Sequence, residues 1–66
     1  MYSKKVGLNW TVEVKDFLII ENHRTKQRYV FFINIEKSKK IYNEIGFLVK
    51  NIKAVIEKYE IQGGAF

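Results

Sequence analysis

The chain has 66 residues, no cysteine, no proline and one histidine, and its formal net charge is +5 at pH 7. This length predicts one domain, residues 1–66, near the lower limit at which a single core suffices. The lack of cysteine excludes disulfides, thiol chemistry and the usual zinc sites, so we expect no metal and no other cofactor. Apolar residues make up 47% of the chain, which is enough for a core.

The first expected element is a strand over about residues 3–15. Apolar and polar residues alternate from Leu8 to Val14, which is the pattern of a strand with one buried face. Gly7 directly precedes this alternation and predicts a bulge or bend, with Tyr2 to Val6 as an extension of the same strand.

Two further strands are expected over about residues 17–22 and 27–35, and both are apolar on both faces. Side chains alternate between the two faces of a strand. One face of the last strand therefore carries four apolar side chains: Tyr29, Phe31, Ile33 and Ile35. We expect a helix to cover this row. Val30 and Phe32 lie on the other face, which then needs another cover, most simply a second copy of the chain.

A helix is expected over about residues 38–61, followed by a short tail over 62–66. Ser38 is interpreted as its N-cap and Gly63-Gly64 as its stop. One apolar seam follows helical spacing through Ile41, Ile45, Leu48, Ile52, Val55 and Tyr59. Roughly 22 helical residues span about 33 Å, so this helix should overhang the sheet. The predicted fold class is α+β: a three-stranded antiparallel β-meander followed by one long C-terminal α-helix packed on one sheet face, in a dimer.

The titratable residues show no catalytic signature. His23 lies in a polar turn, Glu13 lies on the polar face of an amphipathic strand, and Asp16 lies in a turn. No serine or threonine of the chain has an evident base partner for nucleophilic attack. We therefore expect a protein that is not an enzyme.

The function predicted is that of a small, non-catalytic, homo-oligomeric binding or regulatory protein that acts through protein–protein interaction. A phage- or mobile-element-type inhibitor fits the size and composition. The expected partners are a second copy, in a dimer, and a protein target. The predicted interface residues are Val30, Phe32, Leu18, Ile20 and Phe47.

Nucleic-acid binding through a dimer-wide basic surface is the alternative, because the charge of +5 suits a polyanion. The candidate contacts are Lys4, Lys5, Arg24, Lys26, Arg28, Lys37, Lys39 and Lys40. In a meander, the turn from Arg24 to Arg28 lies at the end of the sheet opposite the lysines that follow residue 36. One copy is therefore expected to carry two separate basic ends.

The expected location is the cytoplasm. Met1 to Lys5 run directly into a strand pattern and show no signal peptide. No apolar stretch reaches the roughly 20 residues that a membrane span needs. We therefore expect no membrane partner.

Overall fold

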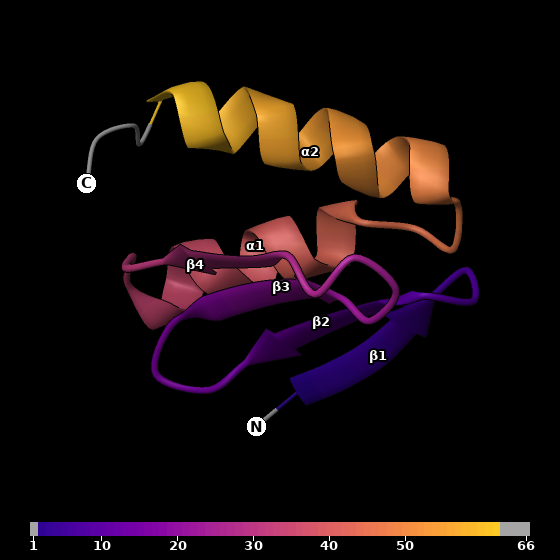
Figure 1. Cartoon of the computed structure of the whole chain (residues 1–66). Helices are drawn as coiled ribbons and strands as arrows, with labels where there is room; N and C mark the ends of the chain where they lie inside the picture. Colours follow the sequence, from indigo (N-terminus) through magenta and orange to yellow (C-terminus); the bar gives the residue numbers. More distant parts are fainter. Residues whose placement is uncertain (1, 63–66) are drawn as a thin grey trace.

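The computed structural model describes the backbone of residues 2–62 and the side chains of residues 2–59. The elements follow in the order β1 (Tyr2–Val6), β2 (Trp10–Val14), β3 (Leu18–Asn22), β4 (Arg28–Phe31), α1 (Ile35–Glu44) and α2 (Val49–Gln62) (Figure 1). The strands form one antiparallel sheet in the order β1-β2-β3-β4. The α+β class and the antiparallel meander are confirmed. The expected three strands and single long helix are wrong, because the described chain has four strands and two helices.

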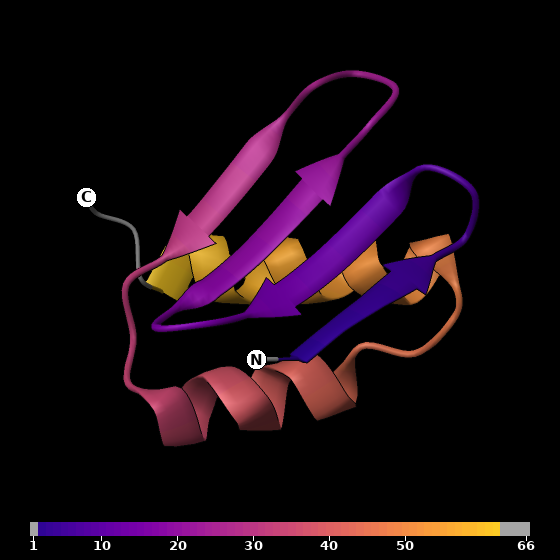
Figure 2. The ribbon, with the colours of Figure 1, turned by 90° about the horizontal axis from the view of Figure 1, so that it is seen from below.

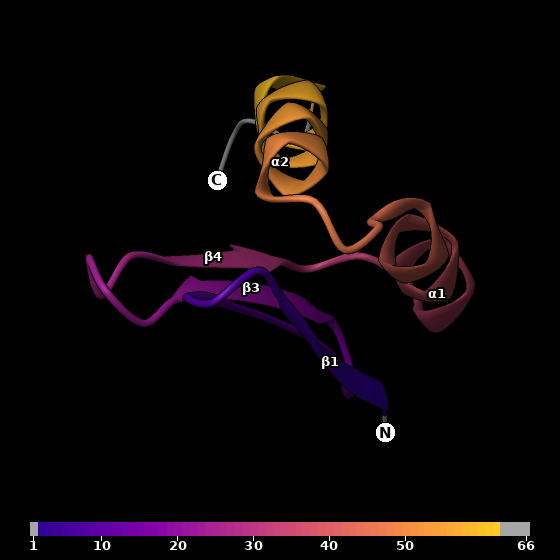
Figure 3. The ribbon, with the colours of Figure 1, turned by 90° about the vertical axis from the view of Figure 1, so that its right-hand side faces the viewer.

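The two helices lie on the same side of the sheet. Viewed from below, the sheet lies in front, α2 crosses behind it, and α1 lies beside β1 (Figure 2). The end-on view agrees, with α2 above the sheet and α1 on the β1 side (Figure 3). No described helix covers the opposite face of the sheet, which is called the open face below.

The strand expected over residues 3–15 is a hairpin of two strands. Gly7 lies in its turn and has a φ of 62°, in the left-handed region that glycine adopts without strain. A Cβ at this position would collide with the side chain of Val49. The glycine predicted as a bulge or bend therefore allows both the turn and the close approach of α2.

The strand expected over residues 27–35 ends early, at Phe31. The Ile33 N–H donates to the Phe31 carbonyl at 3.0 Å, so the chain leaves the sheet there. Asn34 then caps α1, because its Oδ1 accepts a hydrogen bond from the Lys37 N–H at 2.8 Å. Ser38, the expected N-cap, is instead fully buried within the helix.

The helix expected over residues 38–61 is divided by a linker. α1 ends at Glu44, and its C-cap Ile45 has an extended backbone (φ −77°, ψ 117°) that breaks the helix before Gly46. A single helix of about 33 Å would exceed the largest dimension of the described fold, 27 Å, so division keeps both halves on the sheet. Leu48, expected in the apolar seam, lies in the linker and is exposed. The stop expected at residues 63–64 lies outside the described residues.

The core fills the space between the helices and one face of the sheet. Tyr29, Phe31 and Ile33 pack in or against it, as expected of their row, but Ile35, the fourth residue of that row, lies in α1 and is 43% exposed. The seam residues Ile41, Ile45 and Ile52 are each at most 1% exposed. The core consists of Val6, Trp10, Val12, Val14, Leu18, Ile20, Phe31, Ile41, Ile45, Ile52, Val55 and Ile56.

A polar contact joins the two helices. Glu44 at the end of α1 accepts a hydrogen bond from the Tyr59 hydroxyl at 3.1 Å and lies 3.5 Å from the Lys58 ammonium. The Glu44 carboxylate raises the pKa of Lys58 above its ordinary value. Since Lys58 is exposed, this ion pair contributes little to stability.

Candidate functional site

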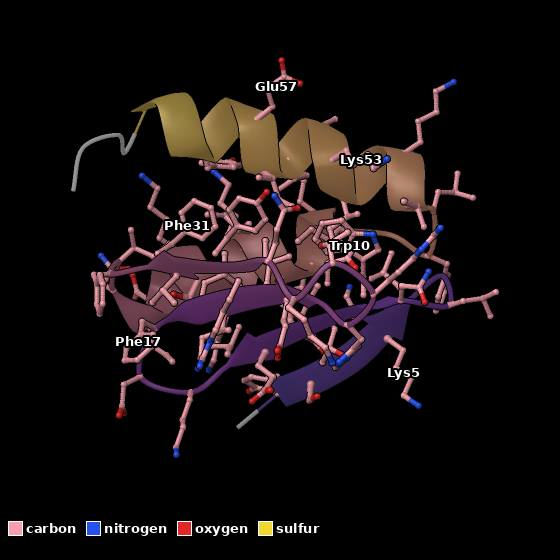
Figure 4. All side chains as sticks on the ribbon, viewed as in Figure 1. Lys5, Trp10, Phe17, Phe31, Lys53 and Glu57 are labelled. Atoms are coloured by element: carbon pink, nitrogen blue, oxygen red, sulfur yellow. The ribbon has the colours of Figure 1, made fainter. Side chains whose placement is uncertain are left out.

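The open face is defined by the register of the four strands. Residues directly opposite one another in antiparallel strands point to the same side. The face away from the helices therefore carries Ser3, Lys5, Thr11, Glu13, Ile19, Glu21, Arg28 and Val30. Figure 4 shows Lys5 and Phe17 directed away from the helices, whereas Trp10 and Phe31 point toward them.

An aromatic cluster lies on the β3–β4 half of this face. We call Phe17, Ile19, Val30 and Phe32 the sheet patch. The rings of Phe17 and Phe32 are 5.1 Å apart between centroids and tilted by 48°. Phe32 is 70% exposed, and Ile19 is 8% exposed although no described helix lies over it. Packing among these neighbours therefore shields Ile19, while Phe32 presents its ring to solvent.

The charges on the open face balance. Lys5 and Arg28 contribute two positive charges, and Glu13 and Glu21 contribute two negative ones. The full chain, by contrast, has a net charge of +5. The open face thus lacks the positive excess that attracts polyanions, and two copies can approach through it without a net like-charge conflict.

Two predicted interface residues are not on any accessible surface. Leu18 and Ile20 have zero exposure and point into the core, so their assignment to an interface is corrected. Their strand is apolar on both faces, and its sequence alone does not show which face the helices cover. The polar residues Thr11 and Glu13 pair with Glu21 and Ile19, and this register places the odd-numbered residues of β3 on the open face. Phe17 and Ile19, which the sequence analysis did not select, take the place of Leu18 and Ile20.

Phe47 lies far from the sheet patch. It belongs to the linker between α1 and α2 and is 84% exposed. Leu8, 96% exposed, lies at the same end of the molecule, where the β1–β2 turn approaches the start of α2 (Figures 1 and 2). Val30 and Phe32 are therefore brought together by the fold, but Phe47 is not brought to them.

Lys4 is not available to a polyanion. It lies on the core-facing side of β1, and its ammonium donates a hydrogen bond to the Tyr42 carbonyl at 2.7 Å and another to the Ile45 carbonyl. The same nitrogen lies 4.4 Å from the centroid of the Tyr42 ring. Burial lowers the pKa of Lys4 from its ordinary value. Lys4 thus closes the C-terminal end of α1, where unpaired carbonyls and the helix dipole favour a cation.

The remaining predicted cations stay in two groups. Arg24 and Lys26 lie in the β3–β4 turn, which Asn22 fixes by accepting hydrogen bonds from the Arg24 and Thr25 N–H groups at 2.9 Å each. Lys5 and Arg28 lie on the two outer strands near this turn. The other group, Lys37, Lys39 and Lys40, lies on α1, whose start is at the opposite end of the sheet (Figure 1). The Lys39 ammonium lies 5.1 Å from the centroid of the Tyr2 ring.

The imidazole of His23 contacts a neighbouring strand. Its Nε2 lies within hydrogen-bonding distance of the Thr11 hydroxyl, at an exposed position on the open face. The backbone N–H of His23 also donates to the Asn9 carbonyl at 2.6 Å, and this bond links the β3–β4 turn to the β1–β2 turn. Among the described residues, no three side chains of His, Asp or Glu gather closely enough to hold a metal ion.

A shallow hollow of about 270 Å³ lies between α2 and the sheet. Its floor includes Trp10 and Tyr29, whose rings are 6.5 Å apart between centroids and inclined by 22°. The hollow is lined by Trp10, Gln27, Tyr29, Lys53, Ile56 and Glu57. Trp10 is only 6% exposed, so its ring serves the core more than a ligand.

Comparisons of the chain with protein-family models, with curated proteins and with solved structures found no match. No helix of residues 2–62 has the length and apolar character needed to cross a membrane. The functional argument therefore depends on the surfaces described above.

Proposed function

We propose that this chain is a small, non-catalytic binding protein that forms homo-oligomers and acts through protein–protein contact. The observation that carries the proposal is the sheet patch, in which an exposed Phe32 ring lies against Phe17 on a sheet face without a helix. Aromatic side chains at the centre of a contact supply a large share of binding energy. The balanced charges of Lys5, Arg28, Glu13 and Glu21 give this patch a polar rim of the kind that protein interfaces have.

The proposed mechanism is steric. A rigid sheet supported by two helices presents its patch without reordering, so little conformational entropy opposes binding. A bound copy or target then has its own surface blocked or bridged. A regulatory subunit or an inhibitor of the phage type acts in this way, and the size of the chain suits either.

Light scattering of the purified chain over about 10 µM to 1 mM tests the proposal, because small interfaces give weak complexes. We expect a mass above that of one chain, and we expect Phe32→Ser to return the mass toward that of the monomer. Phe47→Ser is the matched control, since it removes an exposed phenylalanine at the other end of the molecule. A wild-type monomer at every concentration would contradict the proposal, as would equal effects of the two substitutions.

Nucleic-acid binding is the second candidate, and the exposed cations of the β3–β4 turn favour it. Arg24 and Lys26 project from a turn held by Asn22, and Arg28 follows at the start of β4. A gel shift at low salt with single-stranded and duplex DNA separates the candidates, because phosphate contacts are strongest there. The absence of a shifted band would remove this second candidate and leave the first unaffected.

A further inference from the structure

The two edges of the sheet differ in their protection against pairing with another strand. On β1, Lys4 points inward to α1 and Lys5 points to the open face, and α1 lies beside this edge (Figures 2 and 3). Inward-pointing charges and edge lysines are devices that discourage edge-to-edge association. β4 carries one charged residue, Arg28, at its start and continues with Tyr29, Val30 and Phe31.

β4 forms the other edge of the sheet, and no described element runs along its outer side (Figures 2 and 3). The Asn22 N–H donates to the Gln27 carbonyl at 2.8 Å, so Asn22 and Gln27 form a hydrogen-bonded pair of the β3–β4 ladder. Bonded and non-bonded pairs alternate along an antiparallel ladder. Tyr29 therefore bonds inward to Ile20, whereas the N–H and C=O groups of Val30 point to the outer edge.

We propose that the outer edge of β4 pairs with β4 of a second copy, antiparallel about a two-fold axis at Val30. This inference rests on the proposed function, because it specifies how two copies associate beside the sheet patch. Val30 then faces Val30 of the second copy, and each donates its outward N–H to the other's carbonyl. The result is one continuous sheet of two copies.

The charge distribution along β4 fits a second copy. Antiparallel pairing centred on Val30 brings Arg28 beside Phe32, the residue that follows β4 of the second copy, so the two guanidinium groups do not oppose each other. A guanidinium beside an aromatic ring is a favourable contact. Because Val30 and Phe32 belong to the sheet patch, the same axis joins the two patches into one apolar strip.

Amide hydrogen exchange resolved by NMR tests the pairing directly on the unmodified chain. We expect the exchange of the Val30 amide to slow by tenfold or more as the concentration rises from about 10 µM to 1 mM, over the weak range expected for a small interface. The Tyr29 amide is the internal control, since it already donates within the sheet. A Val30 amide that exchanges equally fast at all concentrations, in a sample that light scattering shows to associate, overturns the edge pairing and leaves the proposed function standing. A monomer at every concentration overturns both.

Two substitutions give an independent test. The chain has no cysteine, so Val30→Cys introduces a single thiol, and we expect it to form a disulfide-linked dimer under mild oxidation. Lys5→Cys, on the other outer strand, is the control and is expected to cross-link at least tenfold more slowly.

A proline and an alanine variant test the hydrogen bond itself. Val30→Pro removes the outward N–H without loss of a hydrogen bond within the sheet, and Val30→Ala retains this N–H. We expect the proline variant to weaken association roughly tenfold relative to the alanine variant, as for two lost hydrogen bonds. Equal cross-linking of the two cysteine variants would refute the pairing.

Discussion

The Lys4 ammonium donates a hydrogen bond to the Tyr42 carbonyl at 2.7 Å and so joins the first strand to the end of the first helix. These residues are 38 positions apart in the sequence. The last carbonyls of a helix have no partner within it, and a cation there is favoured by the helix dipole. Lys4 therefore has a structural role in the fold, although its charge and its neighbour Lys5 suggested a polyanion contact.

Replacement of Lys4 by methionine is expected to lower the free energy of unfolding by about 1–3 kcal/mol. Methionine keeps an apolar stem but loses the hydrogen bonds to the end of α1, each worth about 0.5–1.5 kcal/mol. Lys5→Met is the matched control, because Lys5 is exposed on the open face. We expect Lys5→Met to change the free energy of unfolding by no more than about 0.5 kcal/mol. Urea denaturation of the three proteins measures the differences. Equal changes for the two variants would show that Lys4 does not support α1.

The stability contributed by Lys4 is expected to depend on alkaline pH. Burial lowers the pKa of Lys4 below its ordinary value of 10.5, because the loss of hydration outweighs the attraction of the α1 carbonyls for its charge. Between these two pKa values the unfolded chain therefore binds more protons than the folded one. Stability from this group therefore rises as the pH increases through that window. The difference in unfolding free energy between wild type and Lys4→Met isolates the effect from the other lysines. We expect this difference in unfolding free energy to grow with pH. A decrease would show that the fold raises the pKa of Lys4 instead of lowering it.

Two glycines are expected to respond in opposite ways to alanine. At Gly7, alanine meets both a positive φ of 62° and the side chain of Val49, which we expect to cost about 1–3 kcal/mol. At Gly46, a Cβ meets only Asn51 Oδ1, at an ordinary 3.7 Å. Gly46→Ala is therefore expected to be neutral or to stabilise by up to about 1 kcal/mol through the unfolded state. Thermal melts of both variants measure these changes in stability. A larger loss of stability for Gly46→Ala than for Gly7→Ala would contradict the turn assigned to Gly7.

The beginning of α1 gives a third comparison. Asn34 accepts the Lys37 N–H at 2.8 Å, and its replacement by alanine is expected to cost about 1 kcal/mol, as for other N-caps. The Ser38 hydroxyl donates only a long hydrogen bond of 3.5 Å to the Ile33 carbonyl. Ser38→Ala should therefore change stability by less than about 0.5 kcal/mol, and denaturant unfolding measures both. A larger cost at Ser38 would restore the original interpretation of this serine as the cap.

The orientation of β4 was predictable because strand alternation is local. Tyr29 and Phe31 pack toward the helices, and Val30 lies on the opposite face, as the sequence pattern indicated. The hairpin at Gly7 was not predictable from the pattern. Leu8 keeps the alternation with Trp10, yet it lies in a turn and is exposed. The pairing of Val6 with Trp10 and the positive φ of Gly7 show a turn, where the sequence pattern allowed a bulge or bend.

The division of the helix was not predicted either, because the sequence pattern is local and the division depends on tertiary structure. The apolar spacing continues through Ile45, Leu48 and Ile52 without interruption, so periodicity alone predicts one helix. Gly46 was the local signal, since glycine within a helix is unfavourable by about 1 kcal/mol relative to alanine. The deciding factor is the short sheet, whose described strands have at most five residues. The position of Phe47 could not be predicted for the same reason, because Phe47 lies in the linker that divides the expected helix.

The basic residues allow a final prediction about salt. Lys4 is occupied at the end of α1, so four of the predicted cations, Lys5, Arg24, Lys26 and Arg28, remain near the β3–β4 turn of one copy. On duplex DNA the log–log slope of affinity against salt is about −0.9 for each neutralised phosphate, so contacts from these four residues alone give a slope of about −3.6. If binding occurs, Arg24→Gln with Lys26→Gln should flatten the slope by nearly 2, while the control Lys37→Gln with Lys40→Gln leaves it unchanged. Fluorescence anisotropy over a salt series measures these slopes. A slope much steeper than about −3.6 would mean that further cations contribute, either the lysines of α1 or Lys53, which lines the hollow beside Gln27.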